Sequence, residues 1–341
     1  MAAEGINAPA PPVGVIEALA QGFETVGERL ILVLVPLLLD LCLWLGPRVS
    51  FAPVIDSLID TYYTDLWQPF VVEMNPEMAE QWPDLAEAIA GALGGRATQY
   101  FPLSGIPVLL AGHEAASLPF ECTPPVWEVR TLLQMVGIRL ASLLVGLVLL
   151  SLYISLIAQQ VKEGYIALKR TLARLPVQVL WLGIFALVLP IMLLVIYLPF
   201  ALLTLGVSPL SGFLAFLADW AGRLLALWIA LFMVFTVHSL FMRDRSLPGA
   251  LWDSVRVVQW NVTPTFLLML LIVVIYVALT RIWGLAPAGT WLVPVGIVGH
   301  AFVSTALIAA SFVFFKDRYR YWHEMRTQLL MELERRRASH G

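Results

Sequence analysis

The 341 residues are 60% apolar and only 13% charged, and their mean hydropathy of +0.83 is typical of a membrane protein. The formal net charge of -3 argues against a nucleic-acid binder, because no basic face is available to neutralise a run of phosphates. The two cysteines do not suggest a disulfide framework, since Cys42 lies in an apolar run and Cys122 in a polar segment, so we expect two free thiols.

Apolar runs of about 20 residues, the length that crosses a hydrocarbon core of about 30 Å, recur along the chain. They lie at about 30–46, 131–158, 177–205, 212–242, 264–283 and 294–315. The first run is the shortest, but acidic residues precede it and no small-x-small cleavage site follows, so we expect a retained helix and not a signal peptide. The sequence therefore predicts an all-α integral membrane protein with six transmembrane helices between residues 30 and 315.

Basic residues are concentrated in alternate connections, which predicts the orientation of the helices. The segments 159–176, 243–263 and 316–341 are rich in Lys and Arg, whereas 206–211 and 284–293 contain none. We therefore expect a cytoplasmic amino-terminal segment (1–29) with an interfacial helix, a basic cytoplasmic tail (316–341) and insertion in the cell (plasma) membrane.

The acidic segment 51–130 is predicted to be an extracytoplasmic insertion within the six-helix domain. In the stretch "VIDSLIDTYYTDLW", which begins at Val54, apolar pairs recur every four residues and aspartates occupy the gaps. A second helix is expected at about 76–93. The side chains predicted to contact a membrane surface or a partner are Leu58, Ile59, Tyr62, Tyr63 and Trp67. The alternative is a small helical cap that packs on itself.

A short, half-polar stretch, "PGALWDSVRVVQWNVT", separates two apolar runs at residues 248–263. Its apolar residues fall at helical spacing, with polar residues on the other side. The apolar positions are Leu251, Trp252, Val255 and Val258, and the polar ones are Asp253, Arg256 and Gln259. Such a helix before a span is typical of the membrane interface, where Trp252 would contact lipid; an ordinary cytoplasmic linker is the alternative.

Similar stretches precede the first and third spans, which suggests an internal repeat. Each begins with Ala-Leu, at Ala18, Ala167 or Ala250. A small residue follows four positions later in each case: Gly22, Thr171 and Ser254. We interpret the chain as three repeats of an interfacial helix plus a helical hairpin, the first of which carries the outer insertion.

Three polar residues inside the predicted spans form a candidate intramembrane cluster. Counting along the helices at 1.5 Å per residue places Asp40, Arg139 and His300 at a similar depth below the outer surface. Ionisable groups in hydrocarbon are unfavourable unless they are paired, so they mark candidate sites. Two interpretations stay open: an Asp40 and Arg139 ion pair with a core histidine, or a substrate site.

The sequence contains no motif typical of a soluble enzyme or of a metal site. The five histidines have no metal-ligand spacing with each other or with the cysteines, and no glycine-rich phosphate loop or nucleophile elbow occurs. We therefore expect no enzyme activity, no cofactor and no metal site.

The stretches "SLPGALWDSVRVVQWN" before the fifth span and "AFVSTALIAASFVFFKDR" at the end of the sixth carry a resemblance to a known family. With the six spans and the interfacial helices, they resemble the multi-pass membrane domain of bacterial glycerophosphoryl diester phosphodiesterases and related uncharacterised membrane proteins. The resemblance covers most of the chain outside 51–130, and the hydrolase domain has no counterpart in these residues. It therefore implies a membrane module without an activity.

The functional hypothesis that follows is a non-enzymatic scaffold or accessory subunit that acts through contacts with membrane lipids or with another membrane protein. The amphipathic stretches and the lack of a continuous polar stripe through the spans favour it. The alternative is a transporter or flippase-like carrier of an amphipathic small molecule, with Asp40, Arg139 and His300 as its binding site; an intramembrane enzyme comes third.

Overall fold

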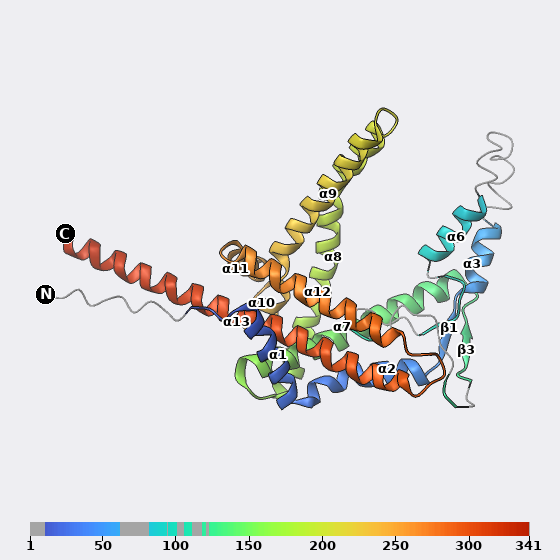
Figure 1. The fold of residues 1–341 in the computed structure, drawn as a ribbon, viewed down its shortest axis with the longest axis horizontal. Coiled ribbons are helices and arrows are strands. Elements are labelled where there is room, and N and C mark those ends of the chain that lie inside the picture. Colours follow the sequence, from blue (N-terminus) through green and yellow to red (C-terminus); the bar gives the residue numbers. More distant parts are fainter. Residues whose placement is uncertain are drawn as a thin grey trace. The chain divides into compact units, whose positions relative to one another are not determined.

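The computed structural model describes residues 11–61, 82–93, 95–100, 106–110, 118–120 and 123–340. Helices dominate, as the sequence predicts, and Figure 1 shows them together with short strands. The helices are α1 (Val15–Glu28), η1 (Leu30–Val33), α2 (Leu34–Leu45), α3 (Ala52–Ile59), α6 (Trp82–Ala92), α7 (Leu132–Glu163), α8 (Leu168–Val207), α9 (Gly212–Met233), α10 (Thr236–Arg243), α11 (Leu247–Gln259), α12 (Val262–Gly284) and α13 (Leu292–His340). The strands are β1 (Arg48–Ser50), β2 (Gln99–Tyr100) and β3 (Val126–Glu128).

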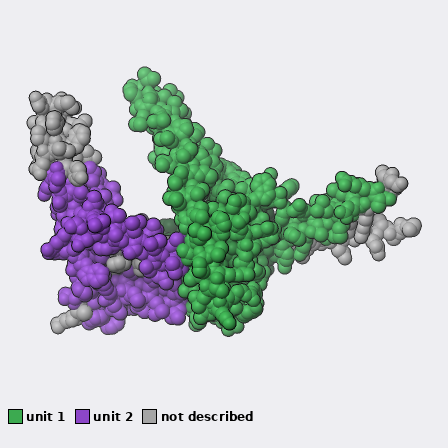
Figure 2. Space-filling view, turned by 180° about the vertical axis from the view of Figure 1, so that it is seen from behind, with its two compact units in different colours: residues 1–32, 151–277, 303–341 green, residues 33–150, 278–302 purple. Residues whose placement is uncertain are grey.

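The chain forms two compact units, which are coloured separately in Figure 2. Unit 1 consists of residues 1–32, 151–277 and 303–341, and unit 2 of residues 33–150 and 278–302. Because the boundaries fall inside α7, α12 and α13, each of these long helices contributes one part to each unit. Sequence order alone therefore does not separate the units.

The long apolar helices agree in part with the predicted spans. Five helical segments among the described residues are long and apolar enough to cross a membrane: Leu132–Glu163, Leu168–Val207, Gly212–Arg243, Val262–Gly284 and Leu292–Met331. The first expected span consists instead of the short turn η1 and the 12-residue helix α2. Twelve residues extend only about 18 Å, less than the hydrocarbon thickness of about 30 Å. A multi-pass membrane protein is therefore supported, with five spans by helix length.

A small sheet in unit 2 was not predicted from the sequence. Strand β1 lies between β2, to which it is antiparallel, and β3, to which it is parallel. Arg48 is the register partner of both Tyr100 and Val126, so the sheet joins the beginning of the insertion to its end. Strands of two or three residues have too few side chains to show a period-two pattern, which explains why the sequence predicts only helices here.

Two hydrophobic cores stabilise the described part of unit 2. One joins α2 to the loop at 106–110 and the start of α13, and its buried members are Leu39, Leu43, Trp44, Ile106, Val108, Leu109, Leu110, Val293 and Ile297. The other lies under α3, and its buried members are Val49, Phe51, Val54, Ile55, Ala90, Val129 and Met135. Residues from the insertion thus contribute to both cores.

In unit 1, α1 packs against α13, and large side chains fill the interior. Tyr153, Phe235, Phe312, Phe314 and Phe315 are all at most 1% exposed. The Tyr153 hydroxyl donates a hydrogen bond to Thr305 Oγ1 at 2.8 Å, which satisfies the phenol of a fully buried side chain.

Helix α8 continues through the position where a separate interfacial helix was expected. The expected break at 167–176 is absent, and Pro176, Pro190 and Pro199 all lie inside the helix. Each proline removes one backbone donor, but a single missing hydrogen bond does not end a helix that its neighbours support. Helix α8 and helix α9 form a long antiparallel hairpin (Figure 1).

Helix α11 is a separate helix, as predicted, but it buries a different face. Its buried side chains are Leu247, Ala250, Asp253, Ser254, Val257 and Val258, whereas Trp252 is 57% exposed. Asp253, which was expected on the polar face, has its partners inside the protein: Ser239 Oγ donates to its Oδ2 at 2.8 Å and Arg243 at 2.7 Å. These two bonds orient the helix, and apolar periodicity alone does not reveal them.

Candidate functional site

Asp40, the first member of the predicted cluster, is fully buried in unit 2. Its carboxylate accepts hydrogen bonds from the backbone N–H groups of Leu109, at 2.9 Å, and Leu110, at 3.0 Å. Both partners belong to the hydrophobic core that contains Leu39 and Leu43, the neighbours of Asp40 on α2. The carboxylate therefore holds the loop 106–110 against α2, which is a structural task.

Arg139 has different partners. Its guanidinium lies over the Phe51 ring, 4.6 Å from the centroid, and donates to the Leu93 carbonyl at 3.3 Å. Among the described residues no ion pair joins it to Asp40, so the expected pairing is wrong. Equal depth along two helices fixes the height of two side chains but not the direction in which each points.

His300 is 2% exposed and lies on α13, one turn after Ile297 of the core around Asp40. The same part of α13 also packs closely on α12, since a Cβ built on Gly299 would stand 2.6 Å from the Trp283 ring. The predicted three-residue cluster is thus divided: Asp40 and His300 flank one core, and Arg139 lies at the other.

The residues predicted to contact a surface are only partly described. Leu58 and Ile59 are half-buried and pack against the core formed by Val49, Phe51 and Val54, to which Met135 of α7 also belongs. The α3 cap therefore packs partly on its own residues and partly on a long helix. Tyr62, Tyr63 and Trp67 lie outside the described residues. Trp252 is exposed on α11, with the guanidinium of Arg256 4.8 Å from its ring centroid.

Arg96 connects the two helices of this cap, a role that the sequence did not suggest. Its guanidinium contacts Asp56 of α3 and Glu87 of α6, each at 2.6 Å. The hydrogen bond that it donates to Asp56 raises the pKa of Arg96 above its usual value, so the guanidinium stays charged. Asp56 and Glu87 are exposed and Arg96 is about one-third exposed, and the contribution of such surface pairs to stability is small, about 1 kcal/mol or less each.

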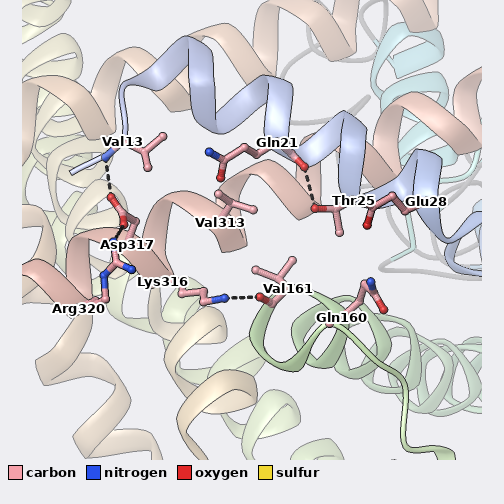
Figure 3. A pocket seen from close by; sticks show the side chains of 11 residues that line it. Val13, Gln21, Thr25, Glu28, Gln160, Val161, Val313, Lys316, Asp317 and Arg320 are labelled. Atoms are coloured by element: carbon pink, nitrogen blue, oxygen red, sulfur yellow. Dashed lines mark hydrogen bonds and ion pairs between the residues drawn. The ribbon is translucent and has the colours of Figure 1, made fainter. Parts of the chain in front are cut away.

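A polar cavity in unit 1 lies between α1, the end of α7 and α13, and has a volume of about 400 Å³ (Figure 3). Gln21, Thr25 and Glu28 line it from α1, and Gln160 lines it from α7. Lys316, Asp317 and Arg320 line it from α13. Because donors, acceptors and both signs of charge converge here, the cavity suits a small polar molecule better than an apolar one.

Most of the charges in this cavity have structural partners. Lys316 Nζ donates to the Val161 carbonyl at 2.6 Å, where a cation stabilises the carboxyl end of α7. Asp317 accepts from the Val13 N–H at 2.6 Å and from Arg320 at 2.5 Å. Gln160 differs, since its Oε1 atom is buried and has no hydrogen-bond partner within the described part of the chain. A ligand with a donor group would satisfy it.

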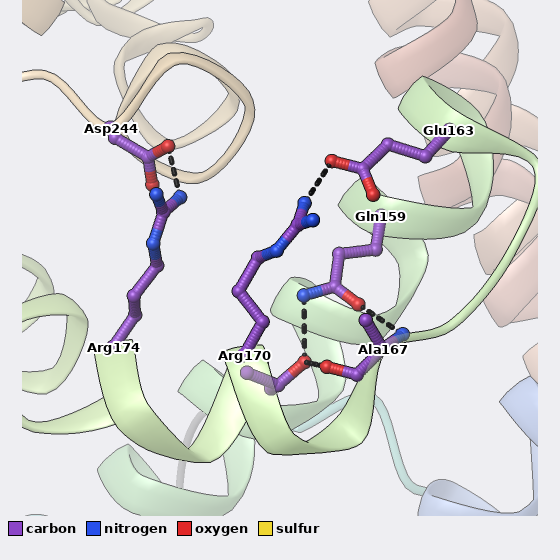
Figure 4. A network of polar contacts seen from close by, with 7 residues as sticks. Gln159, Glu163, Ala167, Arg170, Arg174 and Asp244 are labelled. Atoms are coloured by element: carbon purple, nitrogen blue, oxygen red, sulfur yellow. Dashed lines mark hydrogen bonds and ion pairs between the residues drawn. The ribbon is translucent and has the colours of Figure 1, made fainter.

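A second polar group in unit 1 surrounds the connection between α7 and α8 (Figure 4). Gln159 accepts from the Ala167 N–H at 2.9 Å and donates to Thr171 Oγ1 at 2.8 Å, which fixes the start of α8 on the end of α7. Arg170 pairs with Glu163 at 2.6 Å, and Arg174 pairs with Asp244, which follows α10. The network therefore joins three helix ends at a strongly basic edge of the unit.

No group of three or more His, Cys, Asp and Glu side chains within the described ranges could hold a metal ion. The chain matches no protein-family model, no curated protein and no solved structure.

Proposed function

We propose that this protein is a non-enzymatic membrane scaffold or accessory subunit, whose α8 and α9 hairpin presents an apolar surface to a partner protein. The observation that carries this proposal is the length of the hairpin. Residues 177–207 of α8 extend about 46 Å at 1.5 Å per residue, whereas the hydrocarbon core is about 30 Å thick. To lie wholly within that core, the helix would have to tilt by about 50°, beyond the usual limit of about 40°.

A polar layer crosses the hairpin at the height where the hydrocarbon would end. The Tyr197 hydroxyl donates to Asp219 Oδ1 at 2.5 Å, and Asp219 pairs with Arg223 at 2.9 Å. Tyr197 lies 23 residues, or about 35 Å, beyond Arg174. Tyrosine and arginine at this spacing from a basic helix end are typical of the opposite membrane interface.

The tip of the hairpin beyond this layer is apolar on its surface. Its exposed large apolar side chains, between 46% and 83% accessible, are Leu202, Leu203, Leu205, Leu210, Phe213, Leu214, Phe216 and Leu217. A patch of this kind in water is unfavourable by about 25 cal/mol for each Å² left uncovered. A tip that extends past the bilayer is therefore stable only when another protein covers it.

The proposed topology has cytoplasmic termini, six spans and three repeats. In it the short apolar segment Leu30–Leu45 serves as the first span, and the first turns of α8 take the place of a separate interfacial helix. The packing of the small residues supports the repeat. Gly22, Thr171 and Ser254 are all buried. Thr171 bonds to Gln159 of α7, and Ser254 Oγ accepts from the Phe235 N–H at 3.0 Å and donates to the Phe232 carbonyl at 2.7 Å. Each of these residues thus lies where a helix meets its neighbour closely. The same module would correspond to the membrane domain that the sequence resembles.

A carrier function is the second candidate, and the cavity around Gln160 favours it. That cavity, and not the separated residues Asp40 and Arg139, offers a partnerless acceptor in a space large enough for a solute. A defined metabolite that co-purifies with the protein in mild detergent, detected by mass spectrometry, would support the carrier.

The scaffold is tested by a photoreactive phenylalanine analogue placed at Leu202 in the tip or at Leu187 on the same helix. Both side chains are about equally exposed, at 60% and 63%, but Leu187 lies only about 20 Å beyond Arg174 and so within the hydrocarbon. After irradiation of intact membranes we expect a discrete protein adduct at 202 and only lipid adducts at 187. Lipid adducts alone at both positions would place the whole hairpin in the bilayer and contradict the proposal.

A further inference from the structure

A groove in unit 1 lies between the first turns of α8 and the connection from α10 to α11, beside the network of Figure 4. Its volume is about 300 Å³, at the lower end of the range for ligand pockets. The residues that line it are Ala173, Arg174, Val177, Gln178, Trp181, Leu240, Asp244, Arg245 and Ser246. It is separate from the cavity around Gln160.

The polar end of the groove is suited to an anion. Arg174 pairs with Asp244, and Arg245 lies 3.8 Å from Asp253, which Arg243 also contacts at 2.7 Å. The three arginines outnumber the two aspartates, so this end of the groove carries a net positive charge. Ser246, which lines the groove, is the N-cap of the 13-residue helix α11, and its side chain makes no capping hydrogen bond. Because Pro248 has no N–H, the amides that the first turn can offer are those of Leu247 and Gly249. Exposed amides at a helix N-terminus favour phosphate and carboxylate groups.

Gln178 provides an independent indication of a ligand. It is only 9% exposed, it lines the groove, and its Oε1 atom has no hydrogen-bond partner within the described residues. A buried amide of this kind needs a partner, because leaving it unsatisfied costs about 1–3 kcal/mol. A ligand that carries hydroxyl or amine donors next to an anionic group would satisfy Gln178 and place its negative charge beside the two arginines.

The other end of the groove is apolar and open to the surroundings of α8. Val177 is 57% exposed and Trp181 is half-buried, and Leu180 beside them is 58% exposed. Side chains of this kind suit acyl chains, whereas a free phosphate ion would gain nothing from them. The groove therefore combines a cationic end with an apolar wall, as a membrane lipid requires.

We propose that this groove binds an anionic phospholipid, with its phosphate between Arg174, Arg245 and the N-terminus of α11, and with a head-group hydroxyl on Gln178. Basic pockets between membrane helices bind lipid head groups through the same contacts. The inference rests on the proposed membrane placement of the helix ends, but it does not depend on a partner at the hairpin tip.

The test is native mass spectrometry of the purified full chain in detergent, with phosphatidylglycerol as the probe and phosphatidylcholine, whose head group has no donor, as the comparison. We expect phosphatidylglycerol to be retained preferentially. Arg174→Gln and Arg245→Gln should each weaken its binding about fivefold, the effect of one cation near a phosphate. Gln178→Leu should remove the preference over phosphatidylcholine. Lys169→Gln, which removes an exposed cation of α8 outside the groove, should change binding less than about twofold.

Three results would overturn the assignment. Equal losses in Lys169→Gln and the groove variants would show general attraction to the basic edge. Displacement of the lipid by millimolar inorganic phosphate would identify a free-anion site. Unchanged binding in Gln178→Leu and Arg245→Gln, with thermal unfolding as in the unmodified chain, would exclude the groove. The adduct at Leu202 is measured separately, so either proposal can fail without the other.

Discussion

Gly22 of α1 lies directly against Ala310 of α13: a Cβ built on this glycine would stand 2.5 Å from the alanine Cβ and 2.6 Å from the Ala306 carbonyl oxygen. Both obstacles leave little room for adjustment, since one is backbone and the other is the shortest of side chains. The absence of a side chain at position 22 is therefore what allows α1 to pack on α13.

Gly22→Ala should destabilise the protein by about 1–3 kcal/mol, the usual effect of forcing a methyl group into a close contact. Thermal unfolding in detergent measures the change, and limited proteolysis should show earlier cleavage near α1. Gly27→Ala is the matched control, because nothing lies within 4 Å of a Cβ at that position. Alanine favours a helix over glycine, so this control should be neutral or slightly stabilising. Equal losses in the two variants would contradict the contact.

Asp40→Asn and Arg139→Gln should have additive effects on stability, because the two side chains have different partners. The asparagine side chain would keep one acceptor oxygen but place its NH₂ group against the backbone N–H of Leu109 or Leu110. We therefore expect the free energy of unfolding to fall by about 1–3 kcal/mol. The loss for Arg139→Gln should be smaller, since the guanidinium is exposed where it meets Leu93. In thermal unfolding, the double variant should equal the sum of the single ones within about 0.5 kcal/mol. Recovery of stability in the double variant would reveal a direct pair.

The environment of Asp40 shows where prediction from this sequence ends. An aspartate inside an apolar run must be paired or hydrogen-bonded, and that much follows from its position. Its partners, however, are backbone amides about 70 residues away, and backbone groups leave no signature in the pattern of side chains. The pattern of side chains therefore points to Arg139, a charged group at a similar depth, and not to the loop whose amides bind the carboxylate.

The long helices were easier to predict than their contacts. The apolar runs give the positions of α7, α8, α9, α12 and α13 to within a turn or two at most ends, but α13 continues far past residue 315 as a polar helix. The sheet of β1, β2 and β3 could not be predicted, because its strands are very short and are paired across the insertion. Gln160 and Gln178 were also missed, since a glutamine is notable only once burial shows that it lacks a partner.

Replacing both Leu58 and Ile59 with Asp should loosen the outer insertion and leave the long helices intact. The two side chains pack on the core under α3, so charged groups there would separate α3 from β1 and α6. We expect faster protease cleavage confined to residues 51–130, mapped by mass spectrometry. Asp56→Asn, on the exposed side of α3, should leave that cleavage nearly unchanged, because it weakens only a surface pair. Unfolding of the whole chain in detergent would instead show that the helix bundle depends on this cap.

Reporter fusions that end near residues 170, 250 and 335 should all give a cytoplasmic signal, and one near residue 85 an external signal. The reason is the distribution of Lys and Arg, which favours retention of the basic connections on the cytoplasmic side. Paired reporters that are active only on opposite sides of the membrane provide the measurement. A cytoplasmic signal at 85 would invert the first hairpin and leave Arg96, Asp56 and Glu87 on the inner side.

Asp253→Asn should release α11 from α10. The carboxylate accepts from Ser239 and Arg243 while 6% exposed, and Arg243 also lies over the Tyr319 ring, 3.9 Å from the centroid. Loss of a charged hydrogen bond in this setting should lower the free energy of unfolding by about 1.5–3 kcal/mol.

Asp244→Asn provides the matched control, because Asp244 is exposed and pairs only with Arg174 among the described residues. This variant should lower the free energy of unfolding by about 1 kcal/mol or less, the value of a surface ion pair. A Ser239→Ala and Asp253→Asn double-mutant cycle, followed by thermal unfolding, isolates the contact between the two. The coupling energy should be at least about 0.5 kcal/mol, as for residues that share a hydrogen bond. A coupling near zero, with equal losses for Asp253→Asn and Asp244→Asn, would mean that Asp253 is solvated, and that apolar packing alone orients α11.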